Sequence, residues 1–117
     1  MSDASHPLLV PQTLGPLVLE LKSRAGAQVG FILFNTGEEP VVGVKLEWEY
    51  EAAGSSHPRS APLKDRLSVD LGPGESISRW FDYTSDDGSI YVLAAIGSDF
   101  VTFNVVPAME DLPQLED

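Results

Sequence analysis

Apolar and polar residues alternate along much of this chain, as they do in β-strands that have one face in a core and one in water. The clearest case is VKLEWEYE at residues 44–51, where every second residue is apolar and every residue between is charged. Residues 29–35, VGFILFN, are apolar at almost every position, which is typical of a central strand covered on both faces. These patterns predict strands.

The expected strands are short and are separated by Gly, Pro, Asn or Asp. They cover residues 17–22, 29–35, 41–51, 67–71, 76–83, 90–96 and 100–106. No segment shows a convincing helical period. Many short strands with such turns predict an all-β sandwich or barrel.

The sequence of the last two expected strands predicts how they pair with each other. If Gly97 and Ser98 form a two-residue turn, Ile96 opposes Asp99. Opposed residues share a face, so one face of this hairpin is wholly apolar and belongs to the core. The other face is unusually apolar for a face in water and carries Tyr91, Leu93, Ala95, Phe100, Thr102 and Asn104.

The chain divides into three parts. We expect an N-terminal arm at residues 1–15, because prolines follow His6 and Val10 and disfavour regular structure. One domain at 16–106 follows, and then an acidic tail at 107–117. The tail is either a frayed terminus or an acidic-hydrophobic segment that docks on a partner.

Charge and cysteine content narrow the function. The 117 residues hold eighteen acids and seven bases, for a net charge of −11. Such a surface repels nucleic acid and anionic membranes, so we expect neither as a partner and favour a protein, basic in character. The absence of cysteine excludes disulfides, cysteine-ligated zinc and thiol catalysis. Without a signal peptide or membrane-length apolar run, we expect a cytoplasmic protein if Met1 is the natural start.

Three motifs occur in an order that resembles a known family. An apolar strand ends in FNTG at 34–37, LGPGES at 71–76 opens a later strand, and GSIYVLAA at 88–95 forms another. This order resembles that of bacterial and archaeal immunoglobulin-like modules of the CARDB, adhesion-related type. The resemblance covers 16–106 and implies an immunoglobulin-like antiparallel β-sandwich of about seven strands, without catalytic residues. The glycines expected to take positive φ in these turns are Gly37, Gly74 and Gly88.

The row of Glu47, Glu49 and Glu51 is the first candidate site. Neighbours in this row stand about 7 Å apart along a strand, so they do not converge on one metal ion. The row is either the solvated face of a sheet or an acidic docking surface for a basic partner. Trp48 and Tyr50 then belong to the core or its rim.

Trp80 is the second candidate. In SISRWFDY, residues 76–83, Ile77 and Phe81 suit one face with Arg79 as an intruder. Either Trp80 is in the core with a shifted register, or it is exposed and marks a binding surface. Ile32 and Phe34 present the same alternative, and the arm at Leu8–Val10 is their candidate cover.

Other polar residues give weaker signals. Asp82, Asp86, Asp87 and Asp99 raise the question of calcium, but turn chemistry explains the Asp-Asp-Gly sequence without a ligand. His6 and His57 lie beside prolines in expected loops. No catalytic constellation is present, so we expect no enzyme activity, no metal and no cofactor.

The sequence thus favours a non-catalytic protein-binding or structural module that acts through a sheet face or edge, with a homodimer as one form. Three alternatives stay open: a small acidic inhibitor or immunity-type protein, a carbohydrate-binding module, and a calcium-dependent module. The candidate interaction surface comprises Glu47, Glu49, Glu51, Trp80, Tyr91, Leu93 and Phe100.

Overall fold

The computed structural model describes residues 10–25, 28–51, 63–82, 89–105 and 112. Every regular element in this part of the chain is a strand, which confirms the all-β prediction. The strands are β1 (Gln12–Leu14), β2 (Leu17–Arg24), β3 (Gln28–Asn35), β4 (Val41–Glu51), β5 (Leu63–Leu71), β6 (Ser76–Asp82), β7 (Ser89–Ile96) and β8 (Asp99–Val105).

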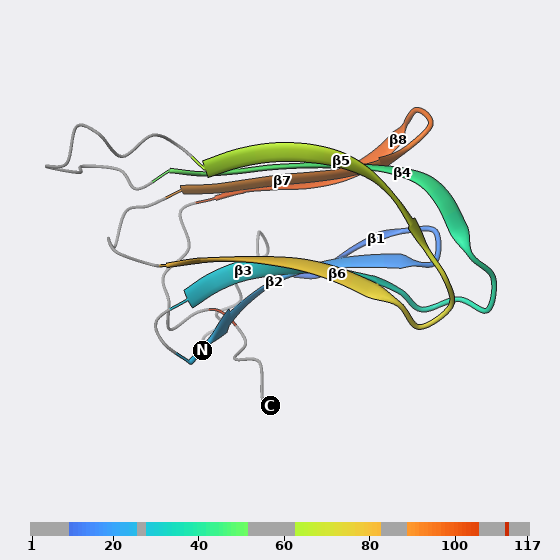
Figure 1. The fold of residues 1–117 in the computed structure, drawn as a ribbon, viewed down its shortest axis with the longest axis horizontal. Coiled ribbons are helices and arrows are strands. Elements are labelled where there is room, and N and C mark those ends of the chain that lie inside the picture. Colours follow the sequence, from blue (N-terminus) through green and yellow to red (C-terminus); the bar gives the residue numbers. More distant parts are fainter. Residues whose placement is uncertain (1–9, 26–27, 52–62, 83–88, 106–111, 113–117) are drawn as a thin grey trace, which may run out of the picture.

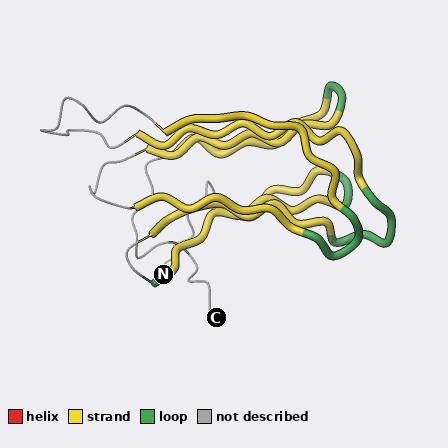
Figure 2. The backbone as a smooth tube through the Cα atoms, viewed as in Figure 1, coloured by secondary structure: helices red, strands yellow, loops and turns green. Residues whose placement is uncertain are grey.

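The strands form two antiparallel sheets of four strands each. Sheet A has the order β1-β2-β3-β6, and sheet B has the order β5-β4-β7-β8. Figure 1 shows them as two facing layers. The tube in Figure 2 shows that the strand axes of the two layers are roughly aligned with each other. The fold is therefore a sandwich, one of the two architectures that the strand pattern allowed.

Two strands differ most from the expected boundaries, and the others differ by two residues or fewer at an end. β1 lies within the segment expected as an arm, because the Gly15-Pro16 turn brings Leu14 opposite Leu17 and leaves Leu14 only 9% exposed. Gly15 has a φ of 60°, which glycine adopts without steric cost. β5 begins at Leu63 rather than at residue 67, because its charged first half pairs with Glu47–Tyr50 of β4 without a register shift.

The core lies between the sheets and takes alternate residues from facing strands. The predicted register of the last hairpin is confirmed, with Ile96 opposite Asp99 and Val92 opposite Phe103. Among the residues that are fully or almost fully buried are Leu17, Leu19, Leu21, Val29, Phe31, Leu33, Val44, Leu46, Ile90, Val92, Ala94 and Phe103.

Aromatic pairs join the two sheets. Phe31 of sheet A meets Trp48 of sheet B with ring centroids 5.6 Å apart, and the rings are tilted by 49°. Tyr50 of sheet B stacks on Phe81 of sheet A at 5.3 Å. The prediction that Trp48 and Tyr50 belong to the core is confirmed, and such pairs add to the stabilisation from burial alone.

Asn35 is a buried polar residue that fastens one end of the sandwich. Its Nδ2 donates to the carbonyl oxygens of Glu39 at 2.9 Å and Leu71 at 3.0 Å. Its Oδ1 accepts from the backbone N–H of Gly37 at 2.8 Å. One side chain thus ties the end of β3 to the 36–39 loop and to the end of β5, which are distant in sequence.

The turn glycines have different roles. Gly74 has a φ of 76°, as predicted for its turn. The same prediction for Gly37 is wrong, because its φ is not positive. The described glycines with positive φ are Gly15, Gly43, Gly74 and Gly97. Gly37 is instead close to Pro16, where an added Cβ would stand 2.9 Å from the proline Cβ. Gly88 lies outside the described residues.

Leu112 is the one described residue of the acidic tail. It is 6% exposed and belongs to the core cluster, so this leucine packs on the domain itself. His6, His57, Asp86 and Asp87 lie outside the described residues. Within the described ranges, no helix has the length and hydropathy needed to cross a membrane.

Candidate functional site

The outer face of sheet B collects most of the predicted surface. Strand register places residues of all four strands in rows across this face. The rows, from β5 to β8, are Lys64–Glu49–Tyr91–Asn104, Arg66–Glu47–Leu93–Thr102 and Ser68–Lys45–Ala95–Phe100. At the end of β4, the backbone of Glu51 pairs with that of Ser89 of β7.

We call the β4 and β5 part of this face the charged half. Bases are interspersed among its acids, since Lys45, Lys64 and Arg66 stand among Glu47, Glu49 and Asp70. The glutamate row is therefore not a uniformly acidic surface. Sequence analysis missed the two bases of β5 as neighbours of this row. The signal was there, because the alternation of β5 extends back from its apolar end to these two positions.

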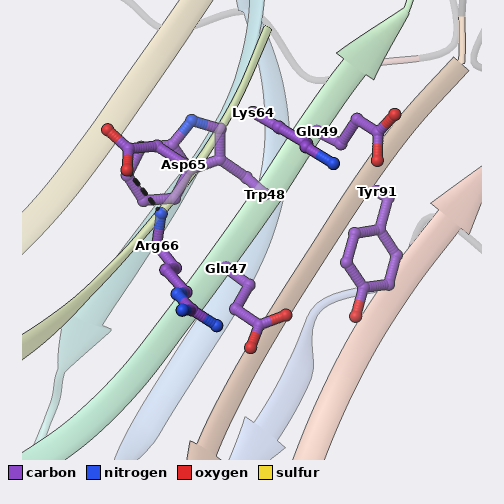
Figure 3. Close-up of a pocket in the computed structure, with 7 residues that line it drawn as sticks. All are labelled: Glu47, Trp48, Glu49, Lys64, Asp65, Arg66 and Tyr91. Carbon is purple, nitrogen blue, oxygen red and sulfur yellow. Dashed lines mark hydrogen bonds between the residues drawn. The ribbon is translucent and has the colours of Figure 1, made fainter. Parts of the chain in front are cut away.

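The charged half contains an open hollow of about 420 Å³. Figure 3 shows Lys64 and Arg66 on one side of it, Glu47 and Glu49 along its middle, and Tyr91 on the other side. Burial and the negative charge of Glu47 both raise the pKa of the Tyr91 hydroxyl, burial more strongly. The phenol is therefore protonated at physiological pH and is able to donate a hydrogen bond.

We call the β7 and β8 part of the face the uncharged half. Its outward residues are Ser89, Tyr91, Leu93, Ala95, Phe100, Thr102 and Asn104. Phe100 is 59% exposed, whereas Tyr91 and Leu93 are half-buried. The hydroxyl of Thr102 donates to the carbonyl oxygen of Val92 at 2.8 Å, so it is used within the sheet. The predicted outer face of this hairpin is confirmed.

The uncharged half ends at a sheet edge, because β8 is the last strand of sheet B. Ile96 and Asp99 flank a two-residue turn, so they form a hydrogen-bonded pair and such pairs recur at every second residue. Phe100, Thr102 and Asn104 therefore direct their backbone N–H and C=O groups away from β7. Within the described residues, no strand takes up these groups.

Trp80 lies on the opposite side of the molecule, on the outer face of sheet A. Register places it opposite Gly30, where an added Cβ would come within 2.8 Å of the indole Cε3. The Arg24 guanidinium stands 4.4 Å from the indole centroid. Trp80 is thus half-buried without a register shift. Its indole occupies the space left by the absent side chain of Gly30 on β3, and Arg24 of β2 lies over the ring.

The remaining sheet A candidates stay on the outer face with Trp80. Ile32 is half-buried and Phe34 is 39% exposed, and Val10, the one described residue of their candidate cover, is itself exposed. Trp80 and Tyr91 face opposite sides of the sandwich. The structure therefore does not bring these two rings onto one plane, which stacking on a sugar would use.

In the described part of the chain, no group of three His, Cys, Asp or Glu residues is placed so that it could bind one metal ion. Asp99 sits at the β7–β8 turn, at the far end of β7 from Ser89.

The assignment of the surface rests on its geometry and on the chemistry of its residues. Compared with known proteins, the chain matches no family model, no curated protein and no solved structure.

Proposed function

We propose that the protein is a non-catalytic protein-binding or structural module that acts through the uncharged half of sheet B and the β8 edge beside it. The observation that carries the proposal is their continuity. The exposed Phe100 belongs to β8, a strand whose outward backbone groups have no partner among the described strands. Exposed apolar patches and open strand edges are both common features of protein-binding sites.

The chemistry of an edge fits this role well. A strand added to β8 gains main-chain hydrogen bonds, which give affinity without demanding a particular sequence. Side chains on the same face then supply selectivity, and here Tyr91 and Leu93 lie one strand from the edge. Tyrosine is well suited to such contacts, because its ring is apolar and its hydroxyl donates a hydrogen bond.

The strand order supports an immunoglobulin-like assignment for the sandwich. β2, β3 and β6 form one layer and β4, β7 and β8 the other, which corresponds to the A-B-E and C-F-G sets of that fold. Trp48 is buried on β4, the equivalent of strand C, where such domains commonly bury a tryptophan. β5 differs from the seven-strand constant type, because it pairs with β4 rather than with β6.

A capture experiment with two matched variants tests the proposal. Phe100→Lys places a charge on the uncharged half, and Val42→Lys makes the same charge change at an apolar residue that is 64% exposed outside it. We expect the native protein and Val42→Lys to retain a partner from lysate at both about 50 mM and about 500 mM salt, since apolar and main-chain contacts are weakly screened. Phe100→Lys should lose it.

Equal retention by both variants would overturn the proposal. A partner that elutes at the higher salt concentration and is lost with Glu47→Gln would instead favour the charged half as a docking surface. Each captured protein is then purified and its binding is measured directly, so that retention on a resin is not the only readout.

A further inference from the structure

The sandwich has four end strands, which are β1 and β6 in sheet A and β5 and β8 in sheet B. An end strand presents unpaired N–H and C=O groups along one side and can template another strand. Proteins block such pairing with short strands, prolines, charges or charges directed toward the core. The four end strands of this protein differ sharply in these features.

Two end strands carry charges where an added strand would meet them. β5 has Lys64, Asp65 and Arg66 in succession, so both of its faces are charged near one end. β6 has Arg79 in register with the buried Phe31, on the core side of sheet A. The Arg79 guanidinium stands 5.2 Å from the Trp48 ring centroid, which confirms that it turns inward.

β1 is blocked by its length and by proline. It has three residues, Gln12–Leu14, and it lies between Pro11 and Pro16. Proline lacks the N–H that a ladder requires, and three residues offer few hydrogen bonds to a partner. β1 is therefore a weak template.

β8 has none of these features. Its seven residues, DFVTFNV, contain no proline and no charge after Asp99. Its pairing with β7 runs from Ile96–Asp99 to Ile90–Val105 without a register shift. The side chains of Phe100, Thr102 and Asn104 are exposed, and their backbone groups point outward. Among the described end strands, β8 is thus the one whose own sequence does not block pairing.

We propose that β8 pairs antiparallel with β8 of a second copy and joins two sheets B into one continuous sheet. This inference rests on the proposed function of the β8 edge. An antiparallel edge can pair with itself about a two-fold axis. The register centred on Thr102 pairs the most residues, because Phe100 of each copy then opposes Asn104 of the other. Val101 opposes Phe103 across the axis and continues the core-facing layer.

The described charges on the outer face of sheet B do not oppose this pairing, although each chain carries a net charge of −11. The glutamates of the sheet face are on β4, two strands from β8. In the dimer, five strand spacings separate the two β4 strands, about 24 Å. The screening length is about 8 Å at physiological salt, so these charges scarcely interact. Asp99 of each copy opposes the uncharged Val105.

The edge favours a second copy over an unrelated strand because its pattern is self-complementary. The outward row has a large apolar residue at one end, a small polar residue at the centre and an amide at the other end. A two-fold axis sets the apolar end beside the amide end twice. Nothing in this row calls for a charged partner.

Proline scanning of the edge tests the dimer. Asn104→Pro removes one outward N–H from each copy and leaves the ladder to β7 intact, and Asn104→Ala keeps that N–H. In analytical ultracentrifugation, we expect the native protein and Asn104→Ala to shift from 12.6 kDa toward twice that mass as concentration rises. Asn104→Pro should weaken association at least about tenfold, since hydrogen bonds are lost symmetrically. Circular dichroism checks that each variant is folded.

Amide exchange by NMR gives an independent readout. In dilute protein, Phe100, Thr102 and Asn104 should exchange quickly while Val101 and Phe103, bonded to β7, are protected. In concentrated protein, all five should be protected. A monomer at every concentration, or a dimer whose three outward amides still exchange quickly, would overturn the inference.

The two proposals fail separately. If the protein is a monomer but still captures a partner that Phe100→Lys abolishes, the second copy is wrong and the binding function stands. If it dimerises and Asn104→Pro has no effect on association, another surface forms the dimer and the β8 pairing is wrong. If neither capture nor association depends on Phe100 and Asn104, both proposals fall.

Discussion

On the outer face of sheet B, β4 and β5 carry charges at alternate positions, whereas β7 and β8 carry none from Ser89 to Ile96 and from Phe100 to Val105. Both halves cover the same core. Val44 and Leu46 beneath the charged half are as fully buried as Val92 and Ala94 beneath the uncharged half. The demands of folding are therefore the same on both sides.

We infer that the difference reflects what each half meets outside the domain. Charges at alternate positions keep a sheet face hydrated and oppose strand addition. Uncharged residues beside an open edge have no such effect, and Phe100 exposes most of its surface there. The comparison separates residues that hold the sandwich together from residues that are free to serve a contact.

Two phenylalanines of β8 give the largest expected contrast. Phe103 faces the core and is 2% exposed, whereas Phe100 faces outward and is 59% exposed. We expect Phe103→Ala to lower the free energy of unfolding by about 3–5 kcal/mol, through lost burial and a residual cavity. Phe100→Ala should change it by less than about 0.5 kcal/mol. Urea denaturation measures both, and a similar loss for the two would contradict the division of roles.

Removing the charges near the start of β5 should make the two edges of sheet B behave alike. The triple variant Lys64→Thr, Asp65→Val, Arg66→Thr removes the three successive charges of β5 and leaves only Asp70 near its other end. Each molecule would then have two edges that pair, so open-ended assemblies should replace a closed dimer. Light scattering should show a mass that grows with concentration. The same triple variant with Asn104→Pro is the control, and unchanged mass in the triple variant would show that charge does not protect β5.

Local patterns made part of this fold predictable. The register of the last hairpin and its outer residues, Tyr91, Leu93 and Phe100, follow from alternation and a two-residue turn, which are all contiguous in sequence. The core role of Trp48 follows from the same kind of pattern. A period of two fixes faces and a short turn fixes register.

Contacts between distant segments were not predictable. Asn35 reads as an ordinary turn residue, and its burial depends on the carbonyl of Leu71 arriving beside it. From the sequence, Trp80 is either core or exposed, because the glycine that makes room for its ring, Gly30, is on another strand. The place of Arg66 beside Glu47 depends on how β5 pairs with β4 across the long segment 52–62, whose length does not set a register.

Reversing one charge tests the pairing of acids with bases in the charged half. Glu47 lies opposite Arg66 on β5 and opposite Leu93 on β7. Glu47→Lys places like charges opposite each other, so we expect a loss of about 0.2–1 kcal/mol in the free energy of unfolding. Leu93→Lys places a base opposite the same glutamate, so its charge should not destabilise the fold. Urea denaturation at low and high salt checks both, and a salt-independent loss would point to packing instead.

Titration of Tyr91 is the smallest effect and marks the boundary between the halves. Burial and the charge of Glu47 raise the pKa of its hydroxyl above the ordinary 10.0. The folded state therefore disfavours the phenolate, so the free energy of unfolding should fall as pH rises from 10 through the folded pKa and should level off above it. Glu47→Gln should lower the pKa but leave the part due to burial, and Tyr91→Phe should abolish the fall. Site-resolved NMR of the Tyr91 ring measures the pKa, and a value unchanged by Glu47→Gln would show that the carboxylate does not act on this hydroxyl.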